Sequence, residues 1–319
     1  MEKLRDRLGS GAPRLGQLAE TCGQVGFAIA VGAYVVDLLY SARTGTSLWV
    51  TPFSLLGLWT LALGLAWLMI KLIQFGRRLQ VPTADEVLAR DARPPVLYLR
   101  SFRDDDATHA VFERWLLRVN YRSEEEELAA TFAEVGPLVA VGRPRELLPH
   151  LGAARFYFRD DEWKDRVAEL MAQASVVVLR VGGSRGLIWE LERALTTLPP
   201  QKLVLLIGHN ANWQTLLAAA PPALAEKLQA LQPQATGFGV GSMRGFIVFD
   251  GACEPRYLPL RRRLLRWSLL HPYLYELRVA LRSCFSTLAL PWSEPPFPIK
   301  QVTIALLLGG LSILLQLSR

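Results

Sequence analysis

The feature that most constrains the fold of this chain is a long run without any charged side chain. Residues 44–70 contain no Lys, Arg, Asp or Glu, and a helix of that length can cross a hydrocarbon layer about 30 Å thick. A second apolar run, at residues 21–40, is interrupted mainly by Gln24 and Asp37, and the turn-like sequence SARTGT separates the two runs. Together they predict a transmembrane helical hairpin, with Asp37 at the depth of the membrane interface.

Basic residues predict the orientation of this hairpin. Lys and Arg are concentrated before it, in residues 3–14, and after it, in residues 71–78, whereas the loop between the two runs contains only Arg43. Because loops rich in Lys and Arg stay in the cytoplasm, both ends of the hairpin are expected there. The sequence therefore predicts a multi-pass membrane protein whose main domain is cytoplasmic.

A third apolar run occupies residues 301–317, between Lys300 and Arg319. Its length is at the short limit for a membrane span, so we predict a third span and keep an interfacial or packed helix as the alternative. Gly309 and Gly310 would allow this helix to pack closely against the hairpin.

The charge balance is basic, with 36 Lys and Arg against 29 Asp and Glu. The densest basic cluster, RYLPLRRRLLRW at residues 256–267, mixes arginines and leucines in a helical pattern. It predicts an amphipathic helix on an anionic bilayer surface, with a subunit or domain contact as the alternative and nucleic acid as a disfavoured partner. The three Cys and four His are scattered, so no metal site, resident cofactor or disulfide is expected.

Between residues 96 and 251, short apolar runs alternate with amphipathic helical patterns. This alternation predicts an α/β domain in which helices cover both faces of a parallel sheet. Strands are expected at residues 96–102, 138–141, 176–181, 202–208 and 245–250, with a short extra strand at 154–158. In such a sheet, ligands bind at the carboxyl ends of the strands, near the point where the strand order reverses.

The chain is thus expected to contain six segments. They are a basic cytoplasmic N-terminus (1–20), the transmembrane hairpin (21–78), a linker (79–95), the α/β domain (96–251), a basic amphipathic helical region (252–297) and a C-terminal hydrophobic helix (298–319).

The most informative stretch of the α/β domain is SVVVLRVGGSRGLIWELERALTTL, at residues 175–198. It predicts a buried strand, a turn at Gly182 and Gly183, and a helix with Ser184 as its N-cap. The absence of GxGxxG and GxxxxGK[ST] patterns disfavours a dinucleotide-binding dehydrogenase and a phosphate-loop NTPase. A carboxylate early in this helix is placed to hold a ribose or to stabilise an oxocarbenium ion during cleavage of a glycosidic bond.

This stretch resembles the TIR (Toll/interleukin-1 receptor) domains and the related nucleoside deoxyribosyltransferase-like folds. The matching residues are ASVVVLRVGG, followed by Ser184, Trp189 and a glutamate on the next helix. The resemblance implies a flavodoxin-like sheet, and in the enzymatic members that glutamate cleaves NAD between nicotinamide and ribose. The spacing of Gly186 and Glu190 is similar to the deoxyribosyltransferase-like pattern, so Glu190 is the first candidate and Glu192 the second.

The resemblance implies a membrane-anchored, TIR-like domain that binds a nucleotide and cleaves the glycosidic bond of NAD or a related nucleotide, in defence or signalling at a bacterial inner membrane. The alternative is a non-enzymatic scaffold that oligomerises through its TIR-like domain and transmembrane helices. The expected partners are the lipid bilayer, a nucleotide and further copies of the chain. The candidate ligand-binding residues are Arg100, Ser101, Phe102, Arg103, Gly182, Gly183, Ser184 and Trp189.

Four of the candidate catalytic and ligand-binding residues have a purely structural alternative. Arg100 can pair with Asp104 or Asp105 instead of binding phosphate. Glu190 can pair with Arg193 on a solvated helix flank, and Glu192 can be a surface charge. Trp189 can pack in the core instead of stacking on a base.

Overall fold

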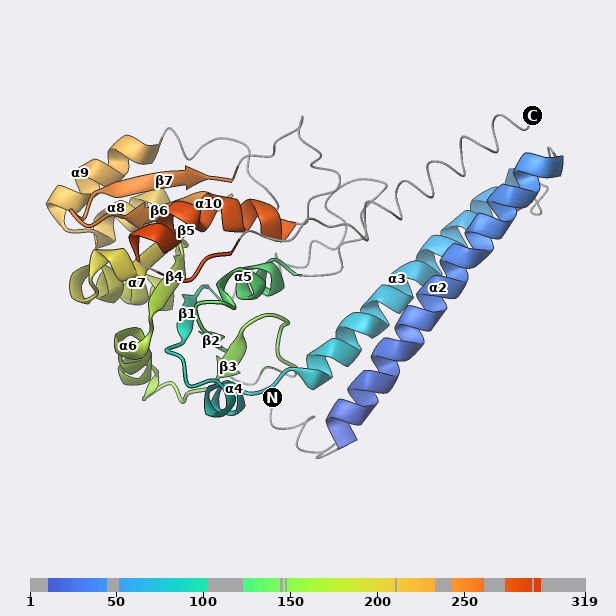
Figure 1. The fold of residues 1–319 in the computed structure, drawn as a ribbon, viewed down its shortest axis with the longest axis horizontal. Helices are drawn as coiled ribbons and strands as arrows, with labels where there is room; N and C mark the ends of the chain where they lie inside the picture. The colour runs from blue at the N-terminus through green and yellow to red at the C-terminus, as the bar shows by residue number, and fades with distance from the viewer. Residues whose placement is uncertain are drawn as a thin grey trace. The chain divides into compact units, whose positions relative to one another are not determined.

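The computed structural model describes residues 11–44, 52–101, 123–143, 146, 148–209, 211–232, 243–260, 273–288 and 290–293. The chain divides into two compact units (Figure 1). The first comprises Met1–Val81 and Pro298–Arg319, and the second comprises Pro82–Phe297.

The first unit contains two long helices that run side by side in opposite directions (Figure 1). Helix α2 covers Ala12–Thr44 and helix α3 covers Pro52–Gln80. A Cβ atom added to Gly16 would lie 2.6 Å from the carbonyl oxygen of Gly76, so the backbones approach too closely for a larger residue. Gly23 makes a similarly close approach to Ile73. Glycines therefore fix the register of this pair of helices.

The sequence predicts that these helices cross a membrane. Among the residues that the structure describes, no helix is long and apolar enough to do so. The run at residues 301–317, for which a third span is predicted, lies outside the described residues.

The second unit is built on one seven-stranded sheet, in the order β3-β2-β1-β4-β5-β6-β7. The strands are β1 (Val96–Leu99), β2 (Leu138–Val141), β3 (Ala154–Phe156), β4 (Val176–Arg180), β5 (Leu203–Gly208), β6 (Met243–Phe249) and β7 (Pro255–Pro259). Strands β1 to β5 pair in parallel, as the sequence predicts. The unit is therefore an α/β domain with a mostly parallel sheet.

Strand β6 runs antiparallel to β5, so the prediction of a fully parallel sheet is wrong for this strand. Strand β7, which the sequence does not predict, pairs antiparallel with β6. Two short helices, α8 (Trp213–Ala219) and α9 (Pro222–Leu231), follow β5, and Pro221 separates them. A single crossover helix would carry the chain back to the amino ends of the strands, where a parallel strand begins. Two successive helices instead return the chain to the carboxyl ends that it left. Strand β6 consequently starts beside the end of β5, where Met243 pairs with Gly208.

The start of the predicted basic helix is also corrected. Pro255–Pro259 form strand β7 instead, because a turn at Asp250 folds the chain back on β6. The Asp250 carboxylate accepts hydrogen bonds from the backbone N–H groups of Ala252 and Glu254, both at 3.0 Å. The remainder of the basic cluster, residues 261–267, lies outside the described residues.

Helices cover both faces of the sheet (Figure 1). One face packs against α8, α9 and three further helices, α4 (Ala84–Arg90), α6 (Trp163–Gln173) and α7 (Arg185–Thr197). The other face packs against α5 (Glu124–Phe132) and α10 (Tyr273–Thr287).

Alternation along the central strands decides which side chains meet which helix. Leu97 and Leu99 of β1 belong to the core beneath α7, whereas Val96 and Tyr98 belong to the core beneath α5. Since successive side chains point to opposite faces, the side chain of Arg100 falls on the α5 side. The strand order reverses between β1 and β4, and Arg100 therefore follows a strand at this switch point.

Candidate functional site

Helix α5 begins with a capping box, and three of the four glutamates in its first turn are buried. The Ser123 hydroxyl accepts a hydrogen bond from the backbone N–H of Glu126 at 3.2 Å, and the Glu126 carboxylate accepts one from the Ser123 N–H at 2.7 Å. This arrangement satisfies two N–H groups of the helix start. The neighbouring residues Glu124, Glu125 and Glu127 are buried, with exposed fractions of 7%, 3% and 3%.

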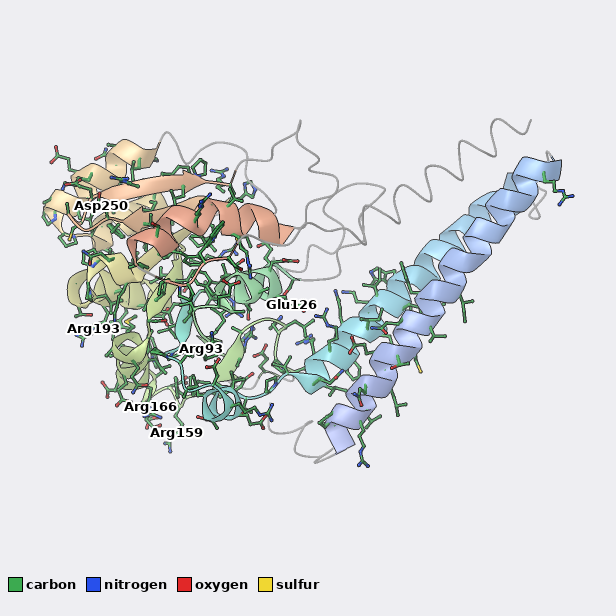
Figure 2. All side chains as sticks on the ribbon, viewed as in Figure 1. Arg93, Glu126, Arg159, Arg166, Arg193 and Asp250 are labelled. Carbon is green, nitrogen blue, oxygen red and sulfur yellow. The ribbon has the colours of Figure 1, made fainter. Side chains whose placement is uncertain are left out.

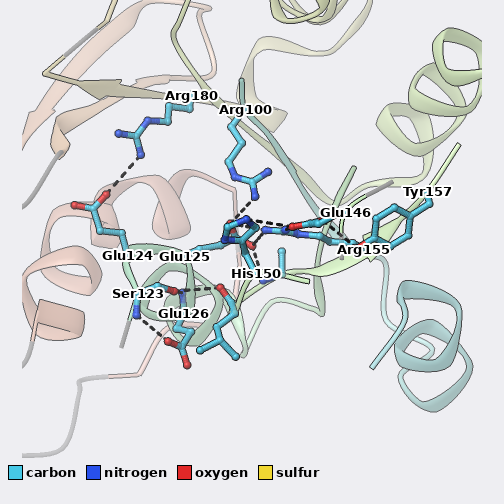
Figure 3. Close-up of polar contacts among 12 residues, drawn as sticks. Arg100, Ser123, Glu124, Glu125, Glu126, Glu146, His150, Arg155, Tyr157 and Arg180 are labelled. Atoms are coloured by element: carbon cyan, nitrogen blue, oxygen red, sulfur yellow. Dashed lines mark hydrogen bonds and ion pairs between the residues drawn. The ribbon is translucent and has the colours of Figure 1, made fainter. Parts of the chain in front are cut away.

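Two arginines bind Glu125, namely Arg100, which directly follows β1, and Arg155 of β3 (Figure 3). The Arg100 guanidinium lies 3.0 Å from Oε2 of Glu125, and the Arg155 guanidinium of β3 lies 2.9 Å from Oε1. All three side chains are at most 3% exposed. Burial alone would raise the pKa of Glu125, but the charges of Arg100 and Arg155 outweigh burial and hold the pKa below its usual range.

The ionic cluster extends from Glu125 along the edge of the sheet. Arg155 also contacts Glu146 at 3.0 Å, and Glu146 accepts a hydrogen bond from the Tyr157 hydroxyl at 3.2 Å. His150 Nε2 lies 3.1 Å from the same carboxylate (Figure 3). In a cluster of this kind the guanidinium groups are already matched by carboxylates, so it ties α5 to the sheet more readily than it attracts an anion.

A second contact joins the start of α5 to β4. The guanidinium of Arg180, the last residue of β4, lies 3.5 Å from the Glu124 carboxylate. Tyr98 is buried beside this pair, and burial raises the pKa of its hydroxyl. Three strand positions on the α5 side of the sheet, together with Arg100 after β1, therefore carry polar side chains; the three are Tyr98, Arg155 and Arg180.

From the sequence, Arg100 is the one predicted member of this cluster, with Asp104 or Asp105 as its possible partner; both lie outside the described residues. Glu125, Glu146, Arg155 and Arg180 are not predicted. A signal was present, because arginines inside apolar strand patterns and four consecutive glutamates at a helix start both require charged partners once they are buried.

Glu190, the preferred catalytic candidate, lies in the second turn of α7 and is 8% exposed. Burial raises its pKa to about 8, and the charge of Arg100 lowers that pKa only in part. Within the described part of the chain, no hydrogen bond or ion pair joins its carboxyl group to another residue. At neutral pH this carboxyl is therefore mostly protonated, in contrast to the carboxylate that the sequence predicts.

The remaining candidates between β4 and α7 and on α7 differ in burial and in the residues that they contact. Glu192 is exposed, and Gly182 is buried in the turn after β4. Gly183 faces Asn212, whose side chain would lie 3.2 Å from an added Cβ. The Trp189 ring packs edge-to-face on Trp163, with a centroid distance of 5.0 Å, which supports core packing more than base stacking.

At the exit of β1, Ser101 is buried next to Arg100, with 6% of its surface exposed. The two following candidates, Phe102 and Arg103, lie outside the described residues. The exits of β1 and β4 thus bring together Arg100 and Glu190, whereas Glu192 points to solvent.

The turn GGSRG, residues 182–186, has the G-x-S-x-G spacing of a nucleophile elbow, although no such elbow is predicted from the sequence. In such an elbow, the serine adopts a strained conformation between strand and helix. Ser184 instead has φ −77° and ψ 147°, an ordinary extended conformation at a helix N-cap. The backbone of this turn therefore does not form a nucleophile elbow.

Among the described residues, no group of three or more His, Cys, Asp or Glu side chains is arranged to hold a metal ion. No known protein family, curated protein or solved structure matches this chain. The resemblance to TIR domains consequently stays a prediction from the sequence.

Proposed function

We propose that the α/β domain binds a nucleotide at the carboxyl edge of its sheet, between β1 and β4, and that Glu190 acts on the glycosidic bond of NAD or a related nucleotide. The observation that carries this proposal is the Glu190 carboxyl group, which is buried, has a pKa raised to about 8 and lies within the influence of Arg100. Buried carboxyl groups with such pKa values are frequent at catalytic sites.

The strand order supports the TIR-like and flavodoxin-like part of the proposal. Without the three-residue edge strand β3, the parallel strands follow the order β2-β1-β4-β5. This is the 2-1-3-4 order of a flavodoxin-like sheet, whose ligands bind at the switch point between its first and third strands.

The protonation state of Glu190 links the proposal to the type of substrate. In NAD the nicotinamide ring is cationic, and cleavage of its bond to ribose releases neutral nicotinamide. The reaction therefore requires an ionised carboxylate and no proton donor. The cationic ring would also favour the ionised form of Glu190. NAD cleavage should therefore increase as pH rises toward 8, whereas a reaction that needs a protonated leaving base should decrease over the same range.

The test is incubation of the purified full chain with NAD and measurement of released nicotinamide. Glu190→Gln should reduce the rate by at least about a hundredfold, because the substituted side chain cannot ionise. The matched control is Glu192→Gln, an exposed glutamate on the same helix, which should keep the wild-type rate. Equal turnover by Glu190→Gln and wild type would remove Glu190 from the mechanism.

We also propose that the helical hairpin anchors the domain at the cytoplasmic face of a bacterial inner membrane. Support comes from the sequence, since residues 44–70 lack charge and Lys and Arg flank the hairpin. Fractionation of cells that express the full chain would test this: extraction by carbonate without detergent would contradict it.

A second function, a non-enzymatic scaffold, is favoured by the ionic cluster of α5. In this cluster the Arg100 guanidinium binds the Glu125 carboxylate instead of a ligand. A residue with a purely structural role would make such a contact. Nucleotide binding without turnover, together with oligomers of the wild-type chain in detergent, would support this alternative over the enzyme.

A further inference from the structure

We infer that the α2–α3 hairpin docks on the hairpin of a second copy of this chain through one apolar face. The first half of this face is a row on α2 formed by Leu15, Leu18, Cys22, Val25 and Ile29, in steps of three and four residues. Its side chains are exposed, from 47% for Leu15 to 66% for Ile29. Steps of three and four produce the apolar seam by which helices pack on one another.

Helix α3 carries a second row with the same steps. Leu65, Leu68 and Phe75 are exposed by 45%, 52% and 43%, and the half-buried Leu72 completes the row. Two parallel apolar seams on neighbouring helices form a surface that a second pair of helices can cover.

The two rows lie on the same side of the hairpin. On α2, Cys22 immediately precedes Gly23, which contacts α3, and on α3, Leu72 immediately precedes Ile73, which contacts Gly23. A step of one residue toward the N-terminus rotates the side-chain direction by about 100° around the helix axis. Because the helices are antiparallel, the same rotation turns both rows toward one face.

The neighbours of the α2 row favour a protein partner over lipid. Arg14, Gln17, Thr21 and Gln24 are exposed on the same helix, so the apolar row is narrow and bordered by polar side chains. A lipid-facing helix would be apolar around its exposed surface. The seam therefore fits a helical partner at this end of the hairpin.

The size of the face fits a second copy of the chain. Seven large side chains on it are about half exposed, which amounts to roughly 700 Å² per subunit, close to the about 800 Å² per partner of a stable interface. A two-fold pairing would bury the same rows on both copies. The inference does not depend on whether the α/β domain is an enzyme.

Cross-linking in membranes that contain the full chain tests the inference. In a background with the exposed Cys22 and Cys253 changed to Ser and the buried Cys284 kept, Leu18→Cys places a thiol in the row and Gln17→Cys places one beside it. A short bismaleimide should join Leu18→Cys chains into dimers at least about tenfold more efficiently than Gln17→Cys chains. Equal cross-linking at both positions, or none at either, would overturn the inference.

A second measurement does not rely on cysteines. Leu18→Glu should raise the dimer dissociation constant in detergent by about tenfold or more, since it buries a charge in the seam, whereas Gln17→Glu should leave it unchanged. A wild-type chain that is monomeric in both detergent and nanodiscs would indicate that lipid covers this face and would also overturn the inference.

Discussion

Glu125 and Glu190 are both buried near the carboxyl edge of the same sheet, yet their carboxyl groups are in opposite states. Glu125 lies between two guanidinium groups, and its pKa is below the usual range. Glu190 is under the influence of Arg100 alone, and burial raises its pKa to about 8. Burial is thus common to both carboxyl groups, and the number of guanidinium groups nearby decides whether the pKa falls or rises. A fully paired carboxylate stabilises the fold, whereas a buried carboxyl without such pairing costs stability and remains available for chemistry.

The largest effect is expected from breaking the paired site. Glu125→Gln removes the charge that two buried arginines share, and we expect a loss of about 3–5 kcal/mol in the free energy of unfolding at pH 7. Denaturant unfolding of the full chain in detergent, followed by tryptophan fluorescence, measures it.

The control is an exposed ion pair of the same domain. Arg166 and Glu169 are 2.8 Å apart and both 55% exposed, and Figure 2 shows Arg166 at the outside of the domain. Glu169→Gln should change the free energy of unfolding by less than about 1 kcal/mol. Equal losses for Glu125→Gln and Glu169→Gln would show that the ionic cluster of α5 is no more important than a surface pair.

A smaller effect of opposite sign is expected at Glu190. Its pKa in the folded protein, about 8, exceeds the ordinary value of 4.5, so the folded state holds the proton more tightly and the wild type loses stability as pH rises between these values. Glu190→Gln should be more stable than wild type by about 1 kcal/mol or less at pH 5 and by roughly 3 kcal/mol at pH 7. Denaturant unfolding at both pH values measures the difference, and a gain that does not depend on pH would contradict it.

The dependence on pH should be reversed for Glu125. Its pKa is lowered on folding, so its stabilising contribution is present above the ordinary pKa and is lost as pH falls through the folded value. The destabilisation by Glu125→Gln should therefore shrink in acid, and the stabilisation by Glu190→Gln should disappear there.

Local patterns were sufficient to predict much of the α/β domain. The apolar runs at residues 96–102, 176–181 and 202–208 correspond to strands β1, β4 and β5, since central strands of a parallel sheet are buried on both faces. The direction of β6 was not predictable in the same way, because it depends on two helices between β5 and β6 that return the chain to one edge.

The candidate site was predicted only in part for a similar reason. The position of Glu190 early in the helix after β4 follows from the strand, turn and helix pattern. Its protonation state does not, because it depends on burial and on the distribution of charges among distant residues. Arg100 binds Glu125, and Arg155 joins the same carboxylate from a third element, so no local spacing could reveal the pairing.

The most direct test of the account is a titration of the Glu190 carboxyl group itself. Carbon-13 NMR of the full chain labelled at glutamate side-chain carboxyls, recorded from pH 4 to 9 with Glu190→Gln for assignment, would report its ionisation. One resonance should titrate near pH 8 and should be missing in Glu190→Gln. A Glu190 resonance that titrates near the ordinary value of 4.5 would contradict the account.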